Sequence, residues 1–204
     1  MTFKENPSNQ TDTQLWVQLK AGSELALGKL VKKFFNPLQN YGYKFVKDED
    51  FVKDCVQEVF IEIWQRRDRI SVPDSVRAYL LSSVRRKVVR EGFRQHIIKD
   101  DDEREVESNI NHIDFSPEWS IIEQESLAEM EEKVNKAINQ LPKRQREVLY
   151  LQYYQSLSRE EIAQIMDINL QSVSNLLQTA FKSFRENWGA IILIFFLRNI
   201  FCKI

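Results

Sequence analysis

The side chains best suited to specific recognition lie in a short polar stretch near the C-terminus. Its amide and hydroxyl side chains are Gln171, Ser172, Ser174, Asn175 and Gln178. Amides can pair with adenine edges in the major groove of DNA, and hydroxyls can donate or accept hydrogen bonds there. Four cations that could hold phosphates are Lys143, Arg144, Arg146 and Lys182. The stretch therefore favours a DNA-binding surface over its plainer alternative, the solvated face of a three-helix bundle.

A second candidate surface is a basic stretch in the middle of the chain. The positions that we expect to contact nucleic acid are Arg77, Arg85, Arg86, Lys87, Arg90 and Arg94. Few acidic residues lie among them in sequence, and crowded like charges are costly unless a polyanion is nearby. The stretch thus favours nucleic-acid binding, although a solvated helix face is the ordinary explanation of such a run.

A third candidate surface has the opposite charge. Its members are Asp54, Gln57, Glu58 and Glu62, with the apolar Ile61 in their centre. An acidic helix face is usually only solvated. An apolar side chain within it is more typical of a surface that binds another protein.

The sequence has no arrangement of residues typical of catalysis or of a bound cofactor. Cys55 and Cys202 form no metal-binding pair, His96 and His112 lie far from any nucleophile, and there is no glycine-rich phosphate loop. We therefore expect a protein that is not an enzyme, with no catalytic residue, metal, cofactor or small-molecule substrate. The formal net charge is −1, so a basic surface must be balanced by acids elsewhere.

The sequence also shows no targeting or membrane-spanning segment. The first five residues have no apolar core, unlike a signal peptide. The longest apolar run, Ala190 to Leu197, is too short for a bilayer, which needs about 20 residues. We expect a cytoplasmic protein.

Four helices are predicted to position the acidic and basic surfaces. The first begins at Asp12, and Ser23 caps the second, which Pro37 breaks or bends. The third begins with the acids at residues 48–50, and Pro73 opens the fourth. The third helix carries a continuous apolar stripe opposite its acidic face, made of Phe51, Val52, Cys55, Val56, Val59, Phe60, Ile63 and Trp64.

A helix-turn-helix is predicted to position the polar stretch. Ser158 and Glu161 form a capping box at the start of its first helix. Residues 167–169 form a tight turn, and Asn169 or Ser172 caps the helix that follows. A further helix is expected from about Ile121 to Ile138.

The fold class that follows is all-α, with two small helical domains joined by an acidic linker. The first domain is expected over residues 12–94 and the linker over 95–118. The helix-turn-helix domain is expected over 119–187, and an apolar tail over 188–204. Packing against the domain is the commonest explanation of such a tail, ahead of a partner or membrane-surface contact.

Two segments resemble the extracytoplasmic-function group of bacterial sigma factors. Residues 22–89 resemble its second conserved region, whose hallmark D-x-x-Q-E-x-F-x-x-x-W is formed here by Asp54, Gln57, Glu58, Phe60 and Trp64. Residues 141–186 resemble its fourth region. The two segments occur in the family's order with an acidic linker between them.

The resemblance implies a transcription initiation factor and assigns a role to each surface. The face of Asp54, Gln57, Glu58, Ile61 and Glu62 would dock on a coiled coil of the largest subunit of core RNA polymerase. The basic helix would engage the melted −10 strand of promoter DNA, and the helix-turn-helix would bind the −35 element. Factors of this group are often held inactive by an anti-sigma factor, which this sequence neither shows nor excludes.

The chain departs from the family pattern at both DNA-binding surfaces. The family usually has Asn after Arg in the −10 segment, where this chain has Arg86. Basic residues are also usual at the positions of Ser174, Leu176 and Thr179. The departures predict a weak −35 contact and leave two alternatives: a helix-turn-helix regulator that acts without polymerase, and a protein-interaction module whose DNA surfaces have decayed.

Overall fold

The computed structural model describes residues 7–97 and 138–187, which divide between two compact units. Within these ranges the chain forms helices and no strands, which confirms the all-α prediction. None of the helices in the described ranges is long and apolar enough to cross a membrane. The apolar tail, most of the expected linker and the helix expected from Ile121 lie outside the described residues.

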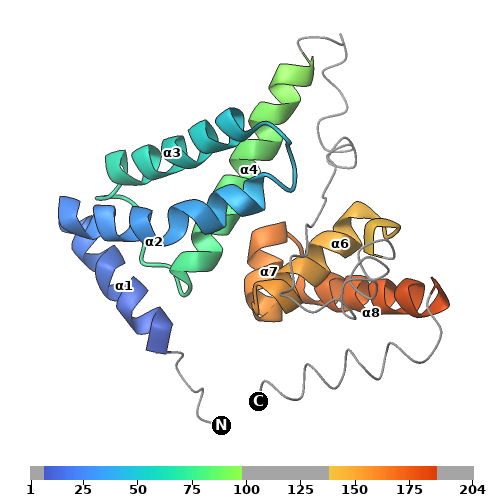
Figure 1. Ribbon diagram of the computed structural model, residues 1–204. Helices are drawn as coiled ribbons and strands as arrows, with labels where there is room; N and C mark the ends of the chain where they lie inside the picture. The colour runs from blue at the N-terminus through green and yellow to red at the C-terminus, as the bar shows by residue number, and fades with distance from the viewer. Residues whose placement is uncertain (1–6, 98–137, 188–204) are drawn as a thin grey trace, which may run out of the picture. The chain divides into compact units, whose positions relative to one another are not determined.

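Four helices build the N-terminal unit (Figure 1). They are α1 (Pro7–Lys20), α2 (Glu24–Gly42), α3 (Glu49–Gln65) and α4 (Val76–Ile97). The second, third and fourth helices all pack on one another, and α1 packs on α2 and α4. The predicted cap Ser23 is confirmed, since its Oγ accepts from the Ala26 amide at 3.3 Å. The structure adds a cap that was not predicted: Asp48 Oδ1 accepts from the Phe51 amide at 3.0 Å.

Trp16 fixes α1 and the loop before α4 to the core. Its side chain is fully buried, and its ring meets Tyr79 edge-on at a centroid distance of 5.2 Å. The indole N–H donates to the Ser71 carbonyl oxygen at 3.1 Å. Because buried indoles rarely leave this donor unpaired, the bond sets the path of the loop that leads into α4.

The structure differs from the predicted helix boundaries at three places. Of the two predicted effects of Pro37, a break or a bend, the break is wrong, because Pro37 lies inside α2, where Phe34 and Leu38 continue the buried stripe on either side of it. The first helix begins at Pro7, five residues before Asp12, since proline is well suited to a first helical position. The fourth begins at Val76, where Ser75 Oγ accepts from the Ala78 amide at 3.2 Å.

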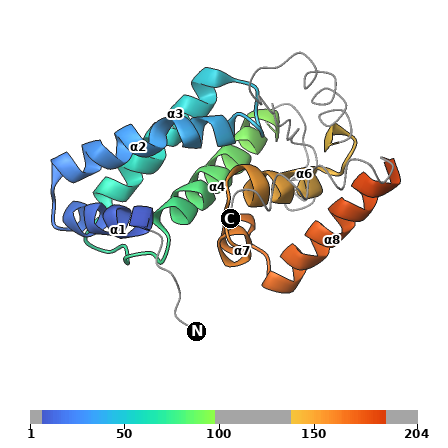
Figure 2. The same cartoon turned by 60° about the horizontal axis from the view of Figure 1, so that its bottom comes forward.

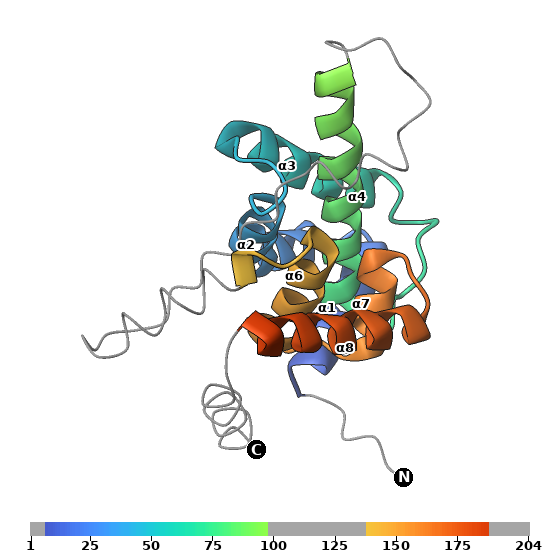
Figure 3. The ribbon, with the colours of Figure 1, turned by 90° about the vertical axis from the view of Figure 1, so that its right-hand side faces the viewer.

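The C-terminal described range, residues 138–187, contains the helix-turn-helix (Figure 2). Its elements are α6 (Lys143–Leu149), the π-helical turn η2 (Tyr150–Tyr154), α7 (Arg159–Met166) and α8 (Leu170–Asn187). Helix α8 packs along α6 (Figure 3). The Tyr153 ring also meets Phe181 of α8 edge-on at 5.6 Å.

The predicted capping box and turn are both confirmed. Ser158 Oγ accepts from the Glu161 amide at 3.2 Å, and Glu161 Oε2 accepts from the Ser158 amide at 2.9 Å. The turn begins at Asp167, whose φ of 54° is left-handed. Of the two candidate caps for α8, the structure selects Asn169, whose Oδ1 accepts from the Ser172 amide at 2.7 Å.

Candidate functional site

The acidic and apolar residues predicted to bind a protein share the outer face of α3. Asp54, Gln57 and Glu58 are exposed, and Ile61 is 52% exposed among them. The predicted stripe on the other side of the helix is buried at Val52, Cys55, Val56, Val59, Phe60 and Ile63. We call the group of Asp54, Gln57, Glu58, Ile61 and Glu62 the docking face.

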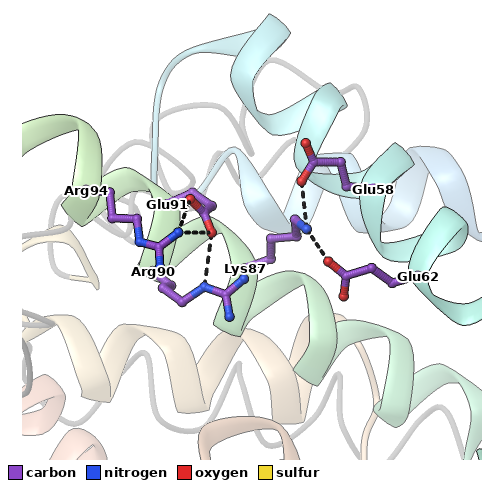
Figure 4. Close-up of polar contacts among 6 residues, drawn as sticks. All are labelled: Glu58, Glu62, Lys87, Arg90, Glu91 and Arg94. Atoms are coloured by element: carbon purple, nitrogen blue, oxygen red, sulfur yellow. Dashed lines mark hydrogen bonds and ion pairs between the residues drawn. The ribbon is translucent and has the colours of Figure 1, made fainter. Parts of the chain in front are cut away.

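Lys87 of α4 reaches two members of the docking face (Figure 4). Its Nζ lies 2.6 Å from Glu58 Oε2 and 2.5 Å from Glu62 Oε1. The lysine side chain is only 8% exposed, whereas the two glutamates are 58% and 43% exposed. The buried lysine therefore acts on the surface only through these two carboxylates.

The pairing perturbs the ionisation of both partners. The hydrogen bond from Lys87, together with its positive charge, lowers the pKa of Glu62 below its ordinary value, against the effect of partial burial. Burial of Lys87 works to lower its own pKa, but the hydrogen bonds and charges of the two glutamates outweigh burial and raise it. Both shifts favour the charged forms of Glu62 and Lys87.

The structure does not support the prediction that Lys87 and Arg85 contact nucleic acid. Lys87 is turned toward α3 and engaged there by two glutamates. Arg85 is 5% exposed, with its guanidinium 5.9 Å from the centroid of the Phe45 ring. Helix α4 packs on both α2 and α3, so more than one of its sides is covered, and two of the six predicted contacts point into the fold.

Arg86, Arg90 and Arg94 are exposed on α4, and Arg77 is half-buried. Glu91 lies between the last two arginines and binds both (Figure 4). Arg90 Nε lies 3.0 Å and Arg94 Nη1 3.4 Å from its carboxylate. The premise that few acids balance this helix is therefore wrong, because Glu58, Glu62 and Glu91 all pair with it.

Sequence reasoning missed Glu91 as a member of this surface. Its spacing of one residue from Arg90 and three from Arg94 is a detectable signal, since residues three apart are neighbours on a helix. The pairing of Lys87 with Glu62 gave no such signal. These residues are 25 positions apart on different helices.

The polar side chains of the helix-turn-helix gather at the start of α8. Gln171, Asn175 and Gln178 are exposed, and Ser172 and Ser174 are half-buried. Gln171 Nε2 donates to Asn175 Oδ1 at 3.0 Å, which orders two of the amides before any ligand arrives. The surface is thus a row of neutral donors and acceptors, of the type that can pair with base edges.

Little positive charge accompanies this row. Lys182 and Arg144 are exposed and Lys143 is half-buried. Arg146 is buried, so the structure does not support the prediction that it holds a phosphate. At two of the positions where the family usually has a cation, Ser174 Oγ donates to the Leu170 carbonyl at 3.2 Å and Thr179 Oγ1 to the Asn175 carbonyl at 2.9 Å. Both hydroxyls are bound to their own helix, so neither replaces a missing phosphate contact.

Comparison with known protein families identifies the class. The model of sigma-70 region 2 matches residues 30–96, and that of sigma-70 region 4 matches residues 131–184. Together the two matches span more than half of the chain. The chain belongs to the sigma-70 family, a non-enzymatic family of transcription initiation factors, as the resemblance of its two segments predicted.

Individual relatives narrow the class to the extracytoplasmic-function group. The chain is 24% identical over 145 residues to the ECF RNA polymerase sigma factor SigK of Mycobacterium tuberculosis and of Mycobacterium bovis. The match covers 70% of this chain and 75% of SigK.

Two solved structures share the fold. One is CnrH in complex with the cytosolic domain of CnrY, with a TM-score of 0.56 and 20% identity over 88% of this chain and 98% of CnrH. The other is RpoE of Bartonella quintana with the anti-sigma factor NepR, with a TM-score of 0.51 and 16% identity over 80% of this chain and 97% of RpoE.

Proposed function

We propose that this chain is a sigma factor that binds core RNA polymerase through the docking face of α3 and directs it to promoters. The observation that carries the proposal is Ile61, a large apolar side chain 52% exposed in the centre of acids. Exposed apolar groups rimmed by polar ones are typical of protein interfaces. Family membership supports the sigma function over a regulator that acts without polymerase.

The promoter contacts in this proposal are divided between two helices. The exposed Arg86, Arg90 and Arg94 of α4 bind phosphates of the melted −10 strand, with Arg77 beside them. The amides at the start of α8 bind base edges of the −35 element. Because α8 brings little positive charge, most of the affinity for DNA comes from α4 and from the polymerase itself.

Two further parts of the proposal follow from the family. The factor works in the cytoplasm, where polymerase and promoters are. It also has an anti-sigma partner, because the RpoE neighbour is in complex with one. Such a partner would compete with core polymerase for the chain in a binding assay.

A charge-reversing variant of the docking face tests the polymerase contact. The double variant Glu58→Arg with Ile61→Asp is expected to abolish capture of core polymerase by the tagged chain. The matched control is Glu24→Arg with Leu25→Asp on α2, where Glu24 is exposed and Leu25 is 71% exposed. Circular dichroism verifies that both variants are helical. Undiminished capture by the first variant, or equal losses in both, would contradict the proposal.

Run-off transcription tests the promoter-directing role. Core polymerase with the chain is expected to start transcription at a defined set of promoters, whereas core polymerase alone is not. The free chain is expected to bind duplex promoter DNA weakly and mainly through phosphates. Tight, sequence-specific binding without polymerase would favour the stand-alone regulator, and the absence of any selected promoter would favour the interaction module.

A further inference from the structure

Lys87 of α4 contacts the docking face from its buried side. Its Nζ lies within 2.6 Å of Glu58 Oε2 and 2.5 Å of Glu62 Oε1, and its own side chain is 8% exposed. Its ion pairs go to one oxygen of each carboxylate, Glu58 Oε2 and Glu62 Oε1, and we call Glu58 Oε1 and Glu62 Oε2 the second oxygens. The side chains of both glutamates remain substantially exposed, so a partner protein can reach both residues.

Without this lysine the two carboxylates would be poorly suited to binding. They lie one helical turn apart, at a spacing where like charges repel each other. Free glutamate side chains also sample several rotamers, and a partner would have to order both of them on binding. A shared buried cation removes the repulsion and fixes one oxygen of each group in advance.

We propose that Lys87 is a positioning residue, which holds Glu58 and Glu62 in the arrangement that a basic surface of the partner protein binds. The inference rests on the proposed function, under which that partner is core RNA polymerase. Arginine or lysine side chains of the partner would bind the second oxygens, with Ile61 between them as the apolar contact. Since Lys87 itself is covered, it contributes without touching the partner.

The test compares polymerase affinities of full-length variants at a temperature where circular dichroism shows each to be folded. Lys87→Met keeps much of the length of the buried side chain but removes the cation. It is expected to raise the Kd for core polymerase by about tenfold. Lys87→Arg restores the cation, and its Kd is expected to stay within about threefold of the wild type. Lys87→Gln replaces the methionine variant if that one fails to fold.

Lys33 provides a matched control for loss of stability. Its Nζ forms an ion pair at 2.5 Å with Asp12, a buried carboxylate that links α1 to α2 away from the docking face. Lys33→Met is therefore expected to lower the unfolding temperature while leaving the Kd for polymerase unchanged. Equal losses of affinity in the Lys33 and Lys87 variants would show that Lys87 only stabilises the fold, and would overturn the inference.

The remaining outcomes separate the inference from the function beneath it. If the wild-type chain does not bind core polymerase, the proposed function fails. If the wild type binds and the Lys87→Met chain binds equally well, only the inference fails. Binding to a single-stranded oligonucleotide is expected to keep its salt dependence in Lys87→Met. A slope reduced by about 0.7, the effect of one phosphate contact on a single strand, would make Lys87 a DNA contact and overturn the inference.

Discussion

Replacing Gly42 with alanine is expected to destabilise the N-terminal unit, although the same change at Gly28 of the same helix is expected to stabilise it. A Cβ at Gly42 would lie 2.7 Å from Val52 Cγ1, 3.4 Å from Val88 Cγ2 and 3.6 Å from Val84 Cγ1. A Cβ at Gly28 would meet no atom within 4 Å. Gly42 therefore permits α2 to approach α3 and α4 closely.

The magnitudes follow from packing and helix propensity. The three valines are β-branched and stiff at χ1, so they cannot swing away from a new methyl group. Overpacking of this kind costs about 1–3 kcal/mol. At Gly28 the change gains the helix propensity of alanine, about 1 kcal/mol. The two variants should therefore differ by about 2–4 kcal/mol in the free energy of unfolding, with opposite signs relative to the wild type.

Urea unfolding followed by tryptophan fluorescence measures this difference. Replacing Trp119 and Trp188 with phenylalanine leaves Trp16 and Trp64, so the signal reports on the N-terminal unit alone. For a unit of this size, each kcal/mol also shifts the Tm by about 4–8 °C. A Gly42→Ala chain as stable as Gly28→Ala would refute the close approach of α2 to Val52, and with it the packing that sets α3 against α4.

Three further predictions concern single side chains. Ser158→Ala removes the reciprocal cap of α7 and is expected to cost about 1 kcal/mol, seen as faster amide exchange within α7. Burial raises the pKa of the Cys55 thiol from 9.0 to about 11, so in a Cys202→Ser background iodoacetamide should label the folded chain at pH 8 far more slowly than the unfolded chain. The pKa of Glu62 lies below its ordinary 4.5. The stability that its charged form adds is therefore present above that pH and is lost as the pH falls through the folded-state pKa. The difference in the free energy of unfolding between the wild type and Glu62→Gln should shrink in acid.

Much of the helix-turn-helix could be predicted because its signals are local. The capping box needs only Ser158 and Glu161 at the correct spacing, and Asn169 satisfies the next helix start by the same mechanism. In both cases the side chain and the amide that it caps lie within three residues. No tertiary contact is needed to recognise them.

Helix boundaries in the N-terminal unit were harder to predict because packing overrides local preference there. Proline inside a helix removes a hydrogen bond and costs about 3 kcal/mol. Helix α2 nevertheless continues through Pro37, since Phe34 before it and Leu38 and Tyr41 after it are all buried. The cost of Pro37 is outweighed here because the buried apolar stripe of α2 continues on both sides of it.

Charge pairing between helices was the least predictable feature, and it changes how the basic helix should be understood. Exposed pairs such as those of Glu91 with Arg90 and Arg94 are worth about 0–1 kcal/mol, so a phosphate can replace the glutamate at little cost. Lys87 is different, because leaving a buried cation without its partners is strongly unfavourable. The arginines of α4 therefore remain available to DNA while Lys87 stays committed to α3. Under the proposed function, a single helix would serve both partners without competition between them, since its exposed arginines would bind the nucleic acid and its buried lysine would order the carboxylates for the polymerase.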